Sequence, residues 1–183
     1  MPQVLVPLAQ GCEELEAITI TDLLVRAGVD VITTGLDDQP VVCSRGTTLI
    51  PNTQIHTVKD RKFDMVILPG GMPGADHLRD NEMVQNILKK HAEANSYVAA
   101  ICAAPKALAQ AGLLENKTAT GFPGVLDSLN LNNTRVKSTP IEVDGKIITS
   151  RGPGTAMDFS LQLIEILQGI EKRKEVEKGL VRE

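Results

Sequence analysis

Aromatic residues are scarce in this chain. Of its 183 residues 2% are aromatic, with no Trp, one Tyr and three Phe. Proteins that hold single-stranded nucleic acid use aromatic side chains as stacking platforms beside a basic groove. This chain has neither feature, since its net charge is −4 and its charged tail, EKRKEVEKGLVRE, mixes both signs. We therefore expect no specific nucleic-acid binding and interpret the tail as a solvated helix face.

Long apolar runs and a signal sequence are also lacking. The N-terminal stretch MPQVLVPLAQ has no basic residue before its short apolar run, unlike a secretory signal. No window approaches the apolar length of a membrane span. These features predict a cytoplasmic protein without membrane attachment. The length and the 42% hydrophobic content fit one domain over residues 1–183.

Cysteine is sparse, and its spacing is not typical of disulfides or zinc. The three cysteines, Cys12, Cys43 and Cys102, are odd in number and irregularly spaced. A disulfide framework or a zinc site shows paired cysteines at recognisable spacings. We therefore expect free thiols in a reducing compartment, with no metal site and no cofactor.

Strand-like and helix-like runs alternate along the chain, which predicts an α/β fold with a parallel sheet covered by helices on both faces. The predicted strands are residues 3–8, 29–34, 63–68, 97–101, and a hairpin of 141–143 with 146–149 across Asp144 and Gly145. The predicted helices are residues 15–27, closed by Gly28, then 81–94, 103–111, 155–167 and 171–180. A second hairpin, 41–44 with 47–50, is expected to project from the sheet.

The most informative segment is SYVAAICAAP, where a short apolar run ends at Cys102 and a helical stretch follows. This pattern indicates a nucleophile elbow, a strained strand-to-helix turn that needs small residues two positions before and after, here Ala100 and Ala104. A thiol presented to solvent at a helix N-terminus would have a lowered pKa and react at neutral pH. The alternative is a small buried residue that ends a core strand.

Two further loops follow parallel strands, and such loops converge at the carboxyl edge of a sheet. LPGG brings Gly70 and Gly71, whose backbone N–H groups fit either an oxyanion hole or an ordinary tight turn. GCEELE brings three carboxylates, of which the first two fit the first turn of a helix. Glu16 lies among apolar neighbours and is expected to turn inward. Beside Cys102 it would have to be protonated, donate a hydrogen bond to sulfur and move a proton.

The three histidines offer no evident partner for a Cys-His pair. His91 lies in the charged stretch KKHAE and is expected on a helix surface, and His56 lies in an edge region. His77 follows Gly71 shortly and is the one candidate for an accessory residue near the crevice, although polar histidines are common at loop-helix junctions.

Taken in order, EELE, VVCSRG, LPGG, AICAAP and SRGPGT resemble the DJ-1/ThiJ/PfpI superfamily over nearly the whole chain. TGFP at residues 120–123 makes it most similar to the bacterial YajL branch. The resemblance implies a flavodoxin-like, class I glutamine-amidotransferase-like three-layer sandwich with a mostly parallel sheet, and a homodimer. It implies that Cys102 is the nucleophilic, easily oxidised cysteine, that Glu16 hydrogen-bonds it, and that Gly70 and Gly71 supply oxyanion amides.

The same resemblance assigns further residues. Arg26 and Arg45 match arginines near the family's dimer interface, which puts Cys43 close to that interface. The substrate pocket would include four residues of three separate segments: Ala103, Phe122, Arg151 and Pro153.

Two positions depart from the family pattern. Many members carry a histidine where this chain has Phe122, so proton transfer would fall to Glu16 or water. Cys12 stands where members more often have a small residue without a thiol. If its loop faces Cys102, Cys12 could trap an oxidised Cys102 as a disulfide; the alternative is a buried bystander thiol.

The resemblance implies a glutathione-independent glyoxalase or deglycase that acts on methylglyoxal and on early dicarbonyl adducts of Cys, Lys and Arg side chains, with a role in oxidative and carbonyl stress. The residues agree, because a Cys102 thiolate can add to an aldehyde while Glu16 moves a proton. A second hypothesis is a redox-sensing chaperone for unfolded client proteins, whose cysteine is oxidised to sulfinate. A cysteine peptidase or amidase is a third, weakened by Phe122.

Overall fold

A seven-stranded sheet forms the centre of the computed structural model, which describes residues 1–182. The strand order is β10-β11-β7-β6-β1-β2-β5, and every neighbouring pair is parallel except the hairpin β10–β11. The strands are β1 Gln3–Leu8, β2 Asp30–Gly35, β5 Thr53–Gln54, β6 Met65–Leu68, β7 Tyr97–Ile101, β10 Ile141–Asp144 and β11 Ile147–Ser150. All six strands predicted for the sheet are confirmed, and the short edge strand β5 was not predicted.

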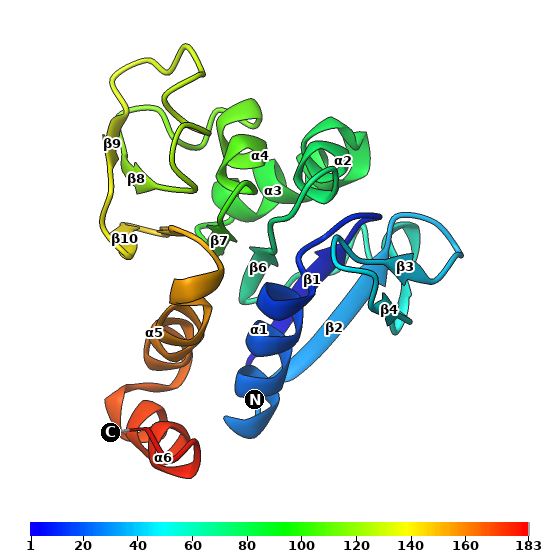
Figure 1. Cartoon of the computed structure of the whole chain (residues 1–183), viewed down its shortest axis with the longest axis vertical. Helices are drawn as coiled ribbons and strands as arrows, with labels where there is room; N and C mark the ends of the chain where they lie inside the picture. The colour runs from blue at the N-terminus through cyan, green and yellow to red at the C-terminus, as the bar shows by residue number, and fades with distance from the viewer. Residues whose placement is uncertain (183) are drawn as a thin grey trace.

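Helices cover both faces of this sheet (Figure 1). One face carries α1 Glu14–Arg26, α5 Ala156–Gln168 and α6 Ile170–Gly179, and the other carries α2 Gly74–Asp80, α3 Glu82–Glu93 and α4 Pro105–Gln110. In β1, Val4 and Val6 pack with the first group of helices, while Leu5 packs with the second. Strands buried on both faces are continuous apolar runs, which is why VLVPL has no polar alternation. The predicted three-layer α/β sandwich is confirmed.

Several shorter elements lie outside the central sheet, in the connections that follow its strands. The predicted projecting hairpin is present as a separate pair, β3 Val41–Val42 with β4 Thr48–Leu49. A parallel pair, β8 Thr118–Thr120 with β9 Arg135–Lys137, was not predicted. Two 3-10 turns complete the set, η1 Ile55–Thr57 and η2 Pro153–Thr155. No helix in residues 1–182 is both long enough and apolar enough to cross a bilayer.

Helix boundaries follow from local chemistry. Gly28 has φ +76° and its N–H donates to the carbonyl of Val25, so it stops α1 as predicted. The helix predicted from residue 103 instead begins at Pro105, because the preceding residues form the turn that leaves β7. Proline suits the first helical position, since its fixed φ is helical and its missing N–H would have no partner there.

Candidate active site

The backbone at Cys102 has the strained geometry expected of a nucleophile elbow. Its φ is +62°, in the left-handed region that costs a non-glycine residue about 1–3 kcal/mol. Hydrogen bonds on both sides hold it there: its N–H donates to the Ser150 carbonyl at 2.9 Å, and its carbonyl accepts from the Phe122 N–H at 2.8 Å. Ala100 and Ala104 are fully buried, so larger side chains would not fit. The predicted elbow is present.

Glu16 turns inward to meet Cys102, as its apolar neighbours predicted. The side chain is 0% exposed, and Oε2 accepts a hydrogen bond from the Gly70 N–H at 2.7 Å. Within the described residues Oε1 has no hydrogen-bond partner of ordinary geometry. The carboxyl group and the Cys102 thiol nevertheless interact directly, and each shifts the pKa of the other. An unfilled acceptor beside a thiol is a group placed to take that proton.

The Glu16 carboxyl group titrates near neutral pH beside a thiol that keeps its proton. Burial raises the pKa of Glu16 from 4.5 to about 7, against the lowering effect of the Gly70 N–H and the Cys102 thiol. Burial and then the Glu16 carboxylate raise the pKa of Cys102 to about 12, against the lowering effect of the Gly71 and Ala103 N–H groups. Such a pair titrates as a unit. Because the Glu16 carboxylate raises the pKa of the thiol, a Cys102 thiolate is least opposed when Glu16 carries the proton.

This result corrects the expectation of an exposed, acidic thiol. Cys102 is 7% exposed, so it is not presented to bulk solvent. The helix that follows has only six residues, and its N-terminal field does not outweigh burial and a neighbouring carboxylate. The condition placed on Glu16, that it must be protonated to assist the sulfur, agrees with its raised pKa.

The two glycines of LPGG have different functions. A Cβ on Gly70 would lie 2.7 Å from the Cys102 Cβ and 2.8 Å from Glu16 Oε2, so only glycine fits between them. Its N–H is already used by Glu16, and the expectation that Gly70 offers a free oxyanion donor is wrong. Gly71, with φ +92°, turns its N–H toward the sulfur, as does Ala103. These two N–H groups are the candidate oxyanion donors.

Three of the predicted pocket residues lie together. Phe122, Arg151 and Pro153 line a cavity of about 260 Å³ beside the elbow. Phe122 is 49% exposed and is joined to the Cys102 carbonyl through its own N–H. The fourth, Ala103, is buried against the elbow and contributes its N–H rather than a pocket wall. Cys102 and Glu16 are not among the residues that line it.

Cys12 does not face Cys102. Its sulfur lies 3.6 Å from that of Cys43, and both thiols are buried. Burial raises the pKa of both, so both are kept as thiols. The hypothesis that Cys12 resolves an oxidised Cys102 is therefore not supported, because the thiol beside Cys12 is that of Cys43. The two cysteines are 31 residues apart in the chain, and no sequence pattern predicted that they would lie together.

None of the three histidines has a recorded contact with Cys102 in residues 1–182. His77 lines another cavity, of about 360 Å³, with Gln10 and Asp37, and the cavity beside the elbow does not include it. His91 is 6% exposed rather than on the surface; its Nε2 accepts from the Phe63 N–H and its Nδ1 faces a carbonyl of its own helix. His56 is exposed in η1. Residues 1–182 hold no group of three or more His, Cys, Asp or Glu side chains suited to a metal ion.

Glu14 has a structural function that the sequence did not reveal. Its carboxylate accepts from the N–H groups of Arg45 and Thr47 and from the Ser44 hydroxyl. Desolvation opposes ionisation, but these N–H groups lower the pKa of Glu14 overall. The carboxylate thus fastens the β3–β4 turn to the start of α1, beyond the general preference of acidic residues for a first helical turn.

Comparison with known proteins agrees with this geometry. The model of the DJ-1/PfpI family matches residues 2–166. This chain belongs to that family. It is 42% identical over 178 residues to protein dj-1beta of Drosophila melanogaster, covering 97% of this chain and 95% of that protein. The crystal structure of that protein gives a TM-score of 0.95 at 40% identity, covering 100% of this chain and 98% of the other.

Two other DJ-1 relatives bear on function. A Caenorhabditis elegans protein named glutathione-independent glyoxalase DJR-1.2 is 32% identical over 171 residues, covering 93% of this chain and 91% of that protein. A structure described as oxidised Toxoplasma gondii DJ-1 gives a TM-score of 0.94 at 37% identity, covering 99% of this chain and 98% of the other. The family therefore includes a member named for glyoxalase activity and a member described in an oxidised form.

Proposed function

We propose that this DJ-1 family protein converts small dicarbonyls such as methylglyoxal to hydroxy acids without glutathione, using Cys102 as nucleophile. The observation that carries the proposal is the pairing of a strained, buried cysteine with a carboxyl group whose pKa of about 7 lets it hold or release a proton at neutral pH. The glyoxalase name of the C. elegans relative supports the same reaction class.

The reaction begins with a proton transfer within the pair. Glu16 takes the thiol proton, and the Cys102 sulfur adds to the aldehyde carbon of methylglyoxal to form a hemithioacetal. The Gly71 and Ala103 N–H groups face this position and stabilise the oxyanion. Glu16 then returns its proton to that oxygen.

The remaining steps move one proton between the adjacent carbons and one between their oxygens. The Glu16 carboxylate removes the hydrogen of the former aldehyde carbon to give an enediol and delivers a proton to the neighbouring carbon. The hydroxyl proton of the former aldehyde oxygen passes to the former ketone oxygen, which leaves a lactoyl thioester on Cys102. Water hydrolyses the thioester and restores the thiol, so the sum is methylglyoxal plus water to lactate. Because Glu16 is 0% exposed, bulk water does not compete for this proton.

A covalent-adduct experiment tests these roles separately. Glu16→Gln removes the carboxylate that raises the pKa of Cys102, so the thiol can still lose its proton to water, but the variant cannot move a proton between carbons; we expect it to accumulate a methylglyoxal adduct on Cys102 while producing no lactate. Cys102→Ala should show neither, as measured by intact mass and peptide mapping.

To distinguish a deglycase from a glyoxalase, the same assay would use methylglyoxal adducts of protected lysine, arginine and cysteine, with an amine scavenger removing free dicarbonyl. Repair at an undiminished rate would support the deglycase.

A redox-sensing function is the second candidate. Glu16 lies beside the sulfur with an unfilled acceptor, and when protonated it can donate a hydrogen bond to a sulfinate on Cys102. The oxidised T. gondii relative makes this chemistry plausible for the family. A client-protecting chaperone would then depend on the oxidised form. A Cys-His peptidase lacks support, because none of the three histidines contacts Cys102 in the described structure.

We also propose a homodimer. The outer face of α1 exposes Leu15, Ile18 and Val25 at helical spacing, and α5 packed beside it exposes Met157. Ile50 of the β3–β4 hairpin is 84% exposed. Contiguous apolar residues on a soluble protein mark an interaction surface. This face lies next to Glu14 and the β3–β4 turn, so a second copy docked there would support the loop that leads to Glu16.

A further inference from the structure

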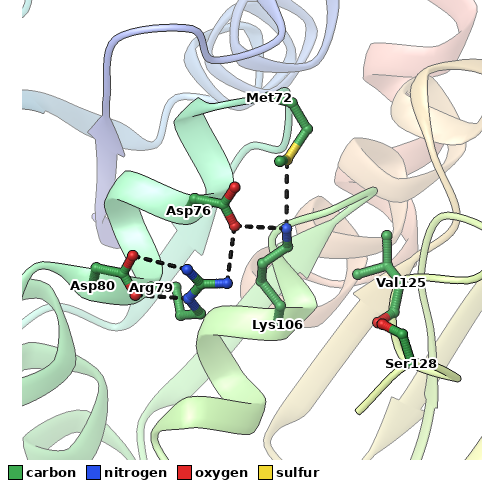
Figure 2. A network of polar contacts seen from close by, with 7 residues as sticks. All are labelled: Met72, Asp76, Arg79, Asp80, Lys106, Val125 and Ser128. Atoms are coloured by element: carbon green, nitrogen blue, oxygen red, sulfur yellow. Dashed lines mark hydrogen bonds and ion pairs between the residues drawn. The ribbon is translucent and has the colours of Figure 1, made fainter.

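One lysine ties the glycine loop and α2 to the helix that follows the nucleophile (Figure 2). The Lys106 side chain, on α4, is 11% exposed. Its Nζ donates to Asp76 Oδ1 of α2 at 2.8 Å and to the Met72 sulfur at 3.4 Å. Met72 directly follows Gly71 in the chain. A single enclosed ammonium therefore holds together three segments that meet at the site.

Lys106 is not placed to stabilise α4, and Asp76 already has another cation as a partner. Lys106 lies in the first turn of α4, where the helix dipole disfavours a cation. Asp76 already has a cation from its own helix, since Arg79 lies 3.0 Å from Oδ1. Arg79 also pairs with Asp80 at 2.7 Å, and neither of these contacts leaves α2. What Lys106 adds is the connection across to α4.

Movement of α2 would reach the candidate oxyanion donor directly. The Ala75 N–H in the first turn of α2 donates to the Gly71 carbonyl at 2.9 Å. On the other side, the Glu13 N–H donates to the Gly70 carbonyl at 2.9 Å. The glycine loop is thus hydrogen-bonded to α2 through Gly71 and to the start of α1 through Gly70. If α2 is free to shift away from α4, the Gly71 N–H moves away from Cys102.

We propose that Lys106 is a positioning residue: by clamping Met72 and Asp76 to α4, it keeps the Gly71 N–H directed at the Cys102 sulfur. The inference rests on the proposed function of Cys102 as a nucleophile. Its test is the alkylation rate of that thiol, which needs no catalytic turnover. Failure of the clamp and failure of the glyoxalase proposal are therefore distinguishable.

The test compares two variants that each remove one cation from Asp76. Lys106→Met keeps the length of the side chain but removes the tie to α4, whereas Arg79→Met removes a contact within α2 only. We expect Lys106→Met to lower the rate of Cys102 alkylation by iodoacetamide at pH 7 about three- to tenfold and to move its pH profile upward, since one pKa unit is a factor of about ten in thiolate. Arg79→Met should alkylate at the wild-type rate, and Lys106→Arg should recover most of the loss.

Steady-state kinetics with methylglyoxal provide the second readout. A misplaced oxyanion donor should lower kcat about tenfold, less than the full loss of a donor, and leave KM nearly unchanged. An unchanged alkylation profile in Lys106→Met, or an equal loss in Arg79→Met, would overturn the proposal. If Lys106→Met does not fold, Asp76→Leu removes the hydrogen bond to Lys106 from the α2 side, together with the Arg79 contact that Arg79→Met controls for; an unchanged profile there overturns the proposal equally.

Discussion

Replacing Glu16 with glutamine should make the protein more stable above neutral pH while abolishing its proposed activity. The pKa of Glu16 is raised from 4.5 to about 7, chiefly by burial. Because the folded-state pKa lies above the unfolded value, the folded protein binds more protons between these pH values. The contribution of Glu16 to the free energy of unfolding is therefore greatest below about pH 4.5 and is lost as the pH rises to about 7.

The expected magnitude follows from the size of this shift. One pKa unit corresponds to about 1.4 kcal/mol, so ionising Glu16 in the folded state costs roughly 3 kcal/mol above pH 7. Glutamine does not ionise and escapes this cost. It retains an amide oxygen for the Gly70 N–H, and the help that this N–H gives to the carboxylate is already contained in the pKa of about 7. We expect a net gain of about 3 kcal/mol at pH 8 and a gain of less than about 1 kcal/mol at pH 5.

Urea denaturation of wild type and Glu16→Gln at pH 5 and pH 8 measures this directly. The informative quantity is the change in their stability difference between the two pH values, because constant effects of the substitution cancel. Glu14→Gln is the matched control: the pKa of Glu14 is lowered, so its titration lies below this window and its effect should be the same at both pH values. A stability difference for Glu16→Gln that is independent of pH would show that the pKa of Glu16 is not raised in the folded protein.

Three further predictions concern other parts of the structure. Limited peroxide should convert Cys102 to sulfinate before Cys12 and Cys43 react: all three thiols are buried, but Cys102 alone has Glu16 beside it to take its proton and the Gly71 and Ala103 N–H groups to lower its pKa; a mapped Cys12–Cys102 disulfide would contradict the arrangement. Gly70→Ala should destabilise the fold by about 1–3 kcal/mol in a thermal or urea titration, because its Cβ would lie 2.7 Å from the Cys102 Cβ; wild-type stability would argue against this packing. Ile18→Glu should shift the protein to a monomer in light scattering, and an unchanged mass would exclude α1 as the dimer face.

Much of the sheet could be predicted because its signals are local. The apolar runs that form β1 and β7 match the predicted boundaries, since both are continuous stretches with polar or small residues at their ends. The elbow at Cys102 was predictable for the same reason: small residues on both sides of a strand-end cysteine leave few other conformations. α2 was missed because GADHLRD is a short polar segment of seven residues that starts with glycine.

The chemistry of the site was harder to predict because burial is a property of the whole fold. A cysteine before a helix suggested a lowered pKa, yet the thiol is enclosed and faces a carboxyl group, which raises it. The use of the Gly70 N–H by Glu16 joins the first turn of α1 to the loop after β6, 54 residues further along the chain. The Cys12–Cys43 contact likewise arises when the β3–β4 hairpin folds over the start of α1. No local sequence pattern predicts such long-range contacts.

Lactate formation from methylglyoxal in the absence of glutathione, with wild type, Cys102→Ala and Glu16→Gln assayed side by side, decides whether the pair of Cys102 and Glu16 is catalytic. We expect turnover by the wild type and its loss in both variants, because the nucleophile and the proton shuttle are both required. No lactate from the wild type, with Cys102 still readily oxidised by peroxide, would contradict this expectation and favour the redox-sensing function.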